Sequence, residues 1–234
     1  MCSCRSHGNW AKSWRGFTDI KNLATIIKRV RSMLVKVREA VTRSPVTRYA
    51  TRLPWFDVML GGGFVGGSVV LLHGEPGAGK STALAQAAAG VPGSLYVCLE
   101  EDVRAVADRV VRLGLRDDMD LLVEPDIGAA LEEAVNSPLV VLDSLQLVEG
   151  RMVDAVKIAV AHARKWNAAV VLVCHETKGG VHAGARVIEH LVDVSVKIGR
   201  GPPRYIATEK NRFGVAGVWL PLEMTERGFV CVAR

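Results

Sequence analysis

One stretch of the chain has the residue types and the spacing to bind phosphate. Residues 74–81 are G-E-P-G-A-G-K-S, a match to G-x-x-x-x-G-K-[ST], and they lie between an apolar run and a helical pattern. The glycines let the backbone curl so that its N–H groups point at phosphate oxygens. Lys80 would reach the β- and γ-phosphates, and Ser81 would offer a hydroxyl to Mg²⁺. The motif predicts a P-loop that binds a nucleoside triphosphate.

A second metal ligand is predicted at the end of another strand. Residues 139–143 are four apolar residues followed by Asp143. A carboxylate at the carboxyl end of such a strand is the Walker B element, which holds the Mg²⁺ shell in P-loop proteins. An apolar run that ends in aspartate is common, and the P-loop earlier in the chain is what makes this one significant.

Nucleotide hydrolysis also needs a group that orients or deprotonates the attacking water. The segment 96-YVCLEED-102 ends a predicted strand with Glu100, Glu101 and Asp102. A carboxylate at that strand end would face the γ-phosphate, and we favour Glu100 over Glu101 for this role. The acids would also suit the N-terminus of the helix predicted to begin near Val103, and both roles can hold at once.

The strand predicted at 169–174 ends in His175, where a polar group would sense the γ-phosphate; a purely structural histidine is the alternative. The following loop, about 176–188, is glycine-rich and basic, which suits contact with a polyanion. Its DNA-binding candidates are Lys178 and Arg186. The residues predicted to bind the nucleotide are Gly74, Glu75, Pro76, Gly77, Ala78, Gly79, Lys80, Ser81, Thr82, Asp143 and His175, with Ser81 and Asp143 as Mg²⁺ ligands.

Two cations stand together near the C-terminus, in 209-EKNRFG-214. Because side chains alternate along a strand, Lys210 and Arg212 would point to one face, where a single phosphate group could meet both. The alternative is a solvated pair of charges.

The elements that would position these residues alternate between strand and helix. Continuous apolar runs at 68–73, 94–99, 139–143 and 169–174 are typical of buried parallel strands. Helical patterns lie near 81–89, 103–113, 127–135 and 151–166, and this alternation predicts an α/β fold with a doubly wound, mostly parallel sheet. Four strands at short spacing (194–199, 203–209, 217–223 and 228–233) predict an antiparallel C-terminal extension.

The basic charge of the chain belongs to its N-terminal part. Net charge is +6, yet residues 1–52 hold twelve Lys and Arg against two acidic residues. We predict a basic arm at 1–51 with an amphipathic helix at about 18–42, followed by a core at 52–234. The arm suggests a polyanion or an acidic neighbour, or it is a solvated tail. Its helix would pack on its own domain, dock on a neighbouring subunit or be a transit peptide.

Composition narrows the class of protein. The 234 residues suffice for one sizeable core, and no apolar run reaches the roughly 20 residues of a membrane helix, so no membrane contact is expected. Five cysteines, an odd and low count, fit a reducing compartment and predict a cytoplasmic protein. Cys2 and Cys4 form a C-x-C near His7, but a structural zinc site needs a second pair, so zinc is not expected there.

Taken together, the motifs resemble the RecA-type core ATPase of the RadA/Sms DNA repair proteins. The matching segments are 57-DVMLGGGFVGGSVVLLHGEPGAGKST-82, 96-YVCLEE-101, 140-VVLDSLQ-146, 172-LVCHETKGG-180, 184-GARVIEHLVD-193 and 210-KNRFG-214. The resemblance covers about 52–233. It departs from the family at Leu99, where a glycine is usual, and we expect a minimal form without the family's zinc module and Lon-protease-like domain.

The resemblance implies a RecA fold, use of ATP and Mg²⁺, binding of single-stranded DNA and assembly into a ring or filament. It further implies a role in recombination or branch migration, with a recombinase as a partner. RecA-like rings place the strand end of 210-KNRFG-214 against the neighbour's nucleotide, so Lys210 and Arg212 would cap the γ-phosphate of the next subunit, as arginine fingers do. The predicted catalytic residues are then Glu100, Glu101, Lys80, Lys210 and Arg212.

Two other functions fit the same motifs. One is a regulatory ATPase of the KaiC-like kind, which shares the acidic pair Glu100 and Glu101 and whose nucleotide state controls assembly without DNA. The other is an accessory protein that binds ATP only as an assembly switch. Aromatic residues are only 6% of the chain, so any DNA contact would be mainly with the backbone.

Overall fold

The computed structural model describes residues 46–176 and 183–232. They belong to one compact unit, Val46–Arg234. This unit begins before residue 52, where we predicted the core to start, because β1 (Arg48–Tyr49) pairs with β2 (Phe64–Val65). Most of the predicted basic arm, its helix at about 18–42 and the pair Cys2 and Cys4 lie outside the described residues.

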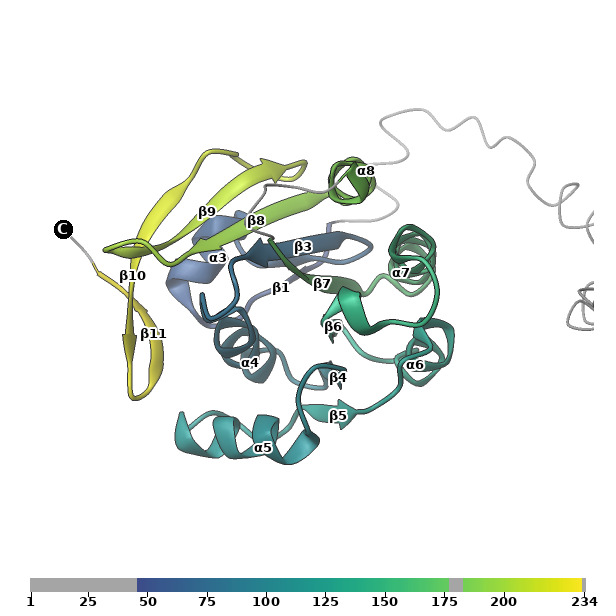
Figure 1. Ribbon diagram of the computed structural model, residues 1–234, viewed down its shortest axis with the longest axis horizontal. Coiled ribbons are helices and arrows are strands. Elements are labelled where there is room, and N and C mark those ends of the chain that lie inside the picture. The colour runs from purple at the N-terminus through teal and green to yellow at the C-terminus, as the bar shows by residue number, and fades with distance from the viewer. Residues whose placement is uncertain (1–45, 177–182, 233–234) are drawn as a thin grey trace, which may run out of the picture. The chain divides into compact units, whose positions relative to one another are not determined.

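A nine-stranded sheet is the centre of this unit, in the order β11-β10-β9-β8-β3-β7-β6-β4-β5 (Figure 1). The strands from β8 to β5 in this order are parallel, and β9, β10 and β11 continue the sheet in antiparallel pairing. The predicted fold class is therefore confirmed. The strands are β3 (Val69–Gly74), β4 (Leu95–Cys98), β5 (Asp120–Leu122), β6 (Leu139–Asp143), β7 (Ala169–His175), β8 (Val194–Gly199), β9 (Arg204–Asn211), β10 (Trp219–Thr225) and β11 (Gly228–Cys231).

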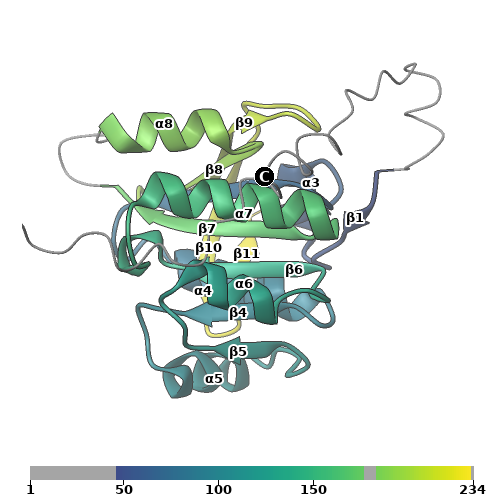
Figure 2. The same cartoon turned by 90° about the vertical axis from the view of Figure 1, so that its right-hand side faces the viewer.

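Helices cover both faces of the sheet (Figure 2). One face carries α3 (Pro54–Leu60), α4 (Lys80–Gly90) and α5 (Val103–Arg112). The other carries α6 (Ile127–Glu133), α7 (Met152–Trp166) and α8 (Ala183–Leu191), and a 3-10 turn η1 (Leu145–Leu147) follows β6. None of the helices in the described part of the chain combines the length and the apolar character needed to cross a membrane.

The apolar runs are continuous because the central strands are buried on both sides. In β3, Val70 and Leu72 pack into the core under α4, while Val69 and Leu71 pack into the core under α7. A strand covered on both faces cannot alternate between apolar and polar residues, and this explains why runs such as 139–143 show no period of two.

Two helices were not predicted. Residues 183–191 fall largely inside the predicted loop at about 176–188, yet they form α8, whose Ile188 is fully buried against the sheet. Arg186 therefore belongs to a helix, and Lys178 lies outside the described residues. The other helix, α3, begins at Pro54 and ends at Leu60, and it is capped by Gly61, whose φ of 73° is left-handed. Proline at the start and glycine at the end are recognised helix signals.

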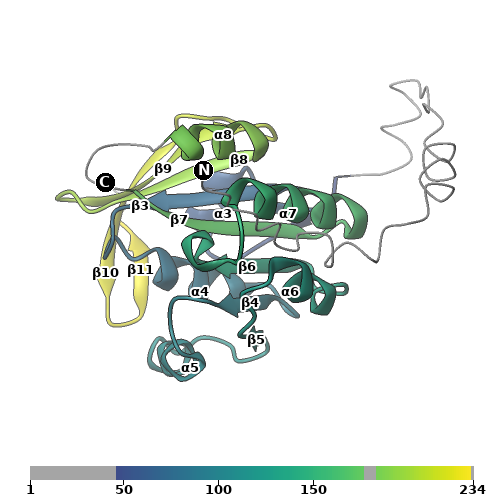
Figure 3. The same cartoon turned by 45° about the vertical axis from the view of Figure 1, so that its right-hand side comes forward.

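The register of the parallel strands brings their carboxyl ends to one edge of the sheet (Figure 3). Gly74 at the end of β3 is level with His175 on β7, and Cys98 at the end of β4 is level with Asp143 on β6. Because β9 runs antiparallel to β8, its last residues return to the opposite edge, where Lys210 pairs with Ser195.

Candidate nucleotide site

The P-loop joins β3 to α4 at the carboxyl edge of the sheet. Gly77 and Gly79 have φ angles of 74° and 100°, which glycine adopts at little cost. A Cβ on Gly79 would also lie 2.6 Å from Cζ of Phe229, so a side chain at this position would collide with β11. The helix after Gly79 has neither a side-chain cap nor an acidic residue in its first turn. Its free N–H groups can therefore receive a phosphate.

The ammonium group of Lys80 is held inside the loop. Its Nζ donates to the carbonyl oxygens of Gly74 (3.0 Å) and Glu75 (3.1 Å), and it lies 3.0 Å from Nδ1 of His175. Burial lowers the pKa of Lys80, and the negative charges of Asp143 and Glu100 oppose this effect. The ammonium is thus stored next to the position where the motif would place the β- and γ-phosphates.

His175 connects Lys80 to Glu100. Its Nε2 lies 2.8 Å from Oε2 of Glu100, while its Nδ1 faces the lysine ammonium, which can only donate. We therefore assign the ring proton to Nε2, so that this N–H donates a hydrogen bond to the carboxylate of Glu100. The sequence predicted a polar sensor at this strand end, and the structure places that side chain between the two groups that would work on the γ-phosphate.

Three consecutive acids after β4 make three different contacts. Glu100 is exposed and faces His175. Glu101 turns to the other side, where Nη2 of Arg109 donates to its Oε1 (2.8 Å) and Oε2 (2.5 Å). Asp102 is the N-cap of α5, and its Oδ1 accepts from the backbone N–H of Arg104 (2.7 Å). Capping is thus the role of Asp102, and Glu100 is the carboxylate that faces the P-loop.

Asp143 lies buried at the end of β6, and one side of its carboxylate is satisfied. The hydroxyl of Tyr96 donates to Oδ2 at 2.6 Å, while Oδ1 is buried without a hydrogen-bond partner. Burial raises the pKa of Asp143, and the neighbouring hydroxyl groups of Tyr96 and Ser81 lower it in part. A buried, unpartnered carboxylate oxygen beside a serine hydroxyl fits Mg²⁺, which prefers oxygen ligands and is usually held by one or two carboxylates. Asp143 and Ser81 are the residues that would hold this ion.

Two arginines beside the P-loop were not predicted. Nη1 of Arg204 donates to the carbonyl oxygens of Gly77 and Ala78, both at 3.2 Å, and Nη1 of Arg200 donates to that of Pro76 at 3.3 Å. Both belong to 200-RGPPR-204, which joins β8 to β9. Tyr96 was also missed as the partner of Asp143. Only the pairing of strands distant in sequence reveals these contacts.

Lys210 and Arg212 lie away from this site. Nζ of Lys210 donates to the carbonyl oxygens of Glu189 (2.6 Å) and Val192 (2.7 Å) at the end of α8. Nη1 of Arg212 lies 2.7 Å from Oδ1 of the buried Asp193. Both side chains do point the same way, as strand alternation predicts, but they lie at the edge of the sheet opposite their own P-loop. They therefore cannot complete the nucleotide site of their own chain.

Known proteins similar to this chain are named for DNA repair. The DNA repair protein RadA of Escherichia coli (strain K12) is 36% identical over 80% of this chain and 45% of its own length. RadA of Bacillus subtilis (strain 168) is 35% identical over 81% and 46% of the two chains. RadA of Halalkalibacterium halodurans is 33% identical over 100% and 56%. The chain spans about half the length of the curated relatives that it matches.

Among solved structures, a KaiC-like protein from Pyrococcus horikoshii OT3 is similar, with a TM-score of 0.67 and 21% sequence identity. The alignment covers 81% of this chain and all of that one. This likeness shows that the fold is that of the RecA-like P-loop proteins. No protein-family model matches the chain.

The contacts of the two glutamates predict different effects on stability. Glu101→Gln should lower the free energy of unfolding by about 1 kcal/mol, because it removes the charge that pairs with Arg109, a mostly buried side chain. The matched change Glu100→Gln should alter it by less than about 0.5 kcal/mol, since Glu100 is exposed. Urea denaturation of both variants measures the difference. Equal losses would mean that Glu101 has no special structural role.

Proposed function

The chain is a member of the RadA family over the half of those proteins that it spans, and from this premise we propose that it is a RecA-type ATPase. In this proposal it hydrolyses ATP as an oligomer and acts on single-stranded DNA in recombination or repair, by branch migration or translocation. The observation that supports it most is the convergence of Lys80, Glu100, Asp143 and His175 at one edge of the sheet, beside the P-loop.

Phosphate binding would use the backbone of the P-loop and the side chain of Lys80. The backbone N–H groups at the start of α4 would receive the β-phosphate, and the positive end of the helix adds to this attraction. The ammonium of Lys80 would exchange the carbonyl oxygens of Gly74 and Glu75 for phosphate oxygens, which bear more negative charge. Arg200 and Arg204 add positive charge along the outer side of the loop.

Ser81 and Asp143 would hold Mg²⁺, which neutralises the charge that develops on the phosphates during transfer. Tyr96 supports this role by fixing Oδ2 of Asp143, so that Oδ1 stays directed away from the tyrosine. Hydrogen-bonded partners of a ligating carboxylate are commonly as important as the ligand itself, because they set its orientation.

Glu100 would act on the attacking water. It stands at the carboxyl edge, is exposed to solvent and lies 2.8 Å from Nε2 of His175. A carboxylate within hydrogen-bond reach of a water can orient it and take its proton. His175 links this carboxylate to Lys80, so a change in the lysine contacts on phosphate binding would be felt at Glu100.

Lys210 and Arg212 would act on the nucleotide of a neighbouring subunit. Their position opposite their own P-loop means that they would reach a bound nucleotide only across a subunit boundary. The Arg212 side chain is 48% exposed although it pairs with Asp193, so part of the guanidinium is free to meet a second partner. Phe213 N–H donates to Oδ1 of Asn211 at 2.9 Å, which fixes the turn that presents both cations.

The proposed function predicts ATP turnover that single-stranded DNA stimulates. ATPase rates should rise when an oligonucleotide is added at low salt, and the stimulation should fall at higher salt, because phosphate contacts release counterions. Light scattering on the same samples gives the mass of the assembly. Slow turnover that DNA does not change, together with nucleotide-dependent oligomers, would favour the KaiC-like regulatory function instead. Binding of ATP without turnover would favour an assembly switch.

The site geometry predicts that Glu100, not Glu101, supports the chemical step. Glu100→Gln should keep ATP binding and lose turnover by about 10²-fold or more, the usual effect of removing a general base. Glu101→Gln should keep most of its turnover despite its lower stability. ATPase assays and binding of a fluorescent ATP analogue, on both variants, separate these effects. Loss of turnover in Glu101→Gln alone would reverse the two roles.

Sharing of the site between subunits predicts complementation. Lys80→Ala and Arg212→Ala should each abolish turnover, and Arg212→Ala and Lys210→Ala should still bind ATP. A mixture of Lys80→Ala and Arg212→Ala subunits should regain activity, because some interfaces then combine an intact P-loop with an intact Arg212. The control mixes Lys80→Ala subunits with subunits that carry both Lys80→Ala and Arg212→Ala. No interface in this mixture has an intact P-loop. If the first mixture stays as inactive as this control, Arg212 does not act across subunits.

A further inference from the structure

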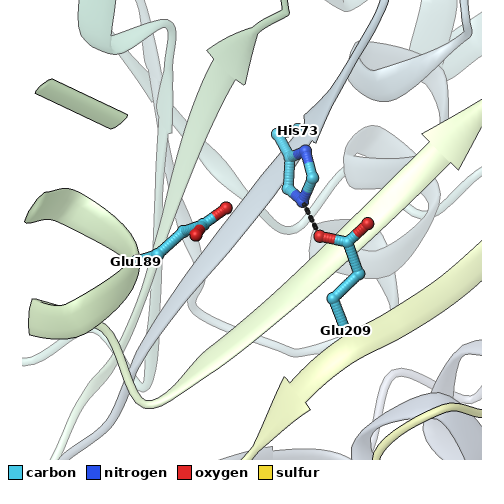
Figure 4. Close-up of side chains that lie close together, drawn as sticks. All are labelled: His73, Glu189 and Glu209. Carbon is cyan, nitrogen blue, oxygen red and sulfur yellow. Dashed lines mark ion pairs between the residues drawn. The ribbon is translucent and has the colours of Figure 1, made fainter. Parts of the chain in front are cut away.

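A second polar cluster lies on the α8 face of the sheet, outside the nucleotide site. Its centre is His73, the last residue of β3 before Gly74, which is 5% exposed. The carboxylates of Glu189 on α8 and Glu209 on β9 point toward its ring (Figure 4). One atom from each of the three side chains lies within 4.8 Å of the others. The first glycine of the P-loop thus directly follows a buried histidine that faces two acids.

The ring of His73 is oriented by a carboxylate at Nδ1, the nitrogen that faces away from Glu209. Its Nδ1 lies 2.8 Å from Oε1 of Glu176, and the same Oε1 is 3.0 Å from Nζ of Lys197. A carboxylate on one ring nitrogen is the arrangement that commonly orients a metal-binding histidine, because it fixes the tautomer and leaves the other nitrogen free to bind. Here the other nitrogen is Nε2, which faces the pair of acids.

Nε2 of His73 faces a carboxylate but makes no well-formed hydrogen bond. It is buried and makes no hydrogen bond of good geometry, although Oε2 of Glu209 lies 3.1 Å away. A buried imidazole nitrogen normally makes a hydrogen bond, so this contact without hydrogen-bond geometry calls for an explanation. Two atoms that bind one tetrahedral ion at about 2.0–2.1 Å are separated by roughly 3.3 Å. The spacing of Nε2 and Oε2 is therefore close to that of two ligands of a single cation.

The charges around the cluster also favour a cation. Glu176, Glu189 and Glu209 bring three negative charges, and Lys197 neutralises one of them through Glu176. Glu189 and Glu209 line a pocket of about 320 Å³. Lys210 lines it as well, but its ammonium donates to the carbonyl oxygens at the end of α8.

We propose that His73, Glu189 and Glu209 form a binding site for a divalent transition-metal cation, Zn²⁺ first among them. One imidazole nitrogen and two carboxylates are a donor set that suits Zn²⁺, whereas Mg²⁺ prefers oxygen ligands alone. A water would complete the four ligands. Rotation of the Glu189 side chain would bring its carboxylate to the ion, since α8 already places this residue beside His73 and Glu209.

This site would connect three segments that the nucleotide chemistry uses. His73 leads into the P-loop, Glu189 precedes the helix end that holds Lys210, and Glu209 precedes Lys210 itself. A bound cation would tie β3, α8 and β9 together and would stabilise the folded chain in proportion to its affinity. The site itself does not depend on ATP turnover, so it can be tested by binding alone.

Zinc binding by the 234-residue chain tests the proposal. The Cys2→Ser, Cys4→Ser variant serves as the background, so that the C-x-C near the N-terminus contributes no ligand. After removal of metal with a chelator, isothermal titration with Zn²⁺ in the absence of nucleotide should show a site of one ion per chain. Glu209→Gln and Glu189→Gln should each weaken it by at least about tenfold. Zn²⁺ should also raise the melting temperature of the background protein and raise it less in these two variants.

Three controls sharpen the result. Glu223→Gln changes an exposed acid on β10 and should leave the affinity for Zn²⁺ unchanged. Asp143→Asn should also leave it unchanged, which separates this site from the nucleotide site. Mg²⁺ in place of Zn²⁺ should give no heat that depends on Glu209. Because His73 is buried and its replacement threatens folding, the two glutamate variants carry the test. If both bind Zn²⁺ as tightly as Glu223→Gln does, the proposal is wrong.

Discussion

The register of four parallel strands is the constraint on which the rest of the structure depends. Because β3, β7, β6 and β4 all end at the carboxyl edge of the sheet, the P-loop, His175, Asp143 and the acids after β4 come together although they lie far apart in sequence. A slip of one residue in any of these strands would turn its polar end group to the other face of the sheet. The buried apolar residues on both faces fix this register, so the same side chains that stabilise the core also set the geometry of the site.

The antiparallel extension of the sheet fixes the position of β9 in the same way, through its register with β8. Since β9 pairs with β8, its beginning lies beside the P-loop and its end lies at the far edge of the sheet. Arg204 at the beginning contacts the loop, and Lys210 at the end holds α8. One strand thereby connects the two edges, and its charged residues divide between the chain's own nucleotide site and the surface that we assign to the neighbouring subunit.

Much of the fold could be predicted from the sequence, because local patterns determine it. The strands at 68–73, 139–143 and 169–174 are apolar throughout, and the structure places β3, β6 and β7 within a residue or so of them. Helix α8 was not predicted, since its sequence is glycine-rich and basic at the start and the helix is held by distant partners, Lys210 and the sheet under Ile188. Contacts such as that of Tyr96 with Asp143, or of His73 with Glu209, depend on which strands become neighbours, and no local pattern carries that information. Likewise, the roles of Glu100 and Glu101 are separated by their partners, His175 on β7 and Arg109 on α5, which lie elsewhere in the sequence.

The storage of the Lys80 ammonium inside the P-loop has a consequence for which ligands the loop accepts. In the described structure this cation already has three acceptors, two carbonyl oxygens and one ring nitrogen. An incoming anion must replace them together, because a buried ammonium that loses one acceptor without gaining another is left poorly solvated. A ligand with a single acceptor oxygen cannot do this, whereas a chain of phosphates offers several oxygens at once. The loop therefore favours ligands that bring several oxygens at once. The number that they must bring is set by the acceptors of Lys80 that they replace, two of which are backbone carbonyl oxygens of the loop.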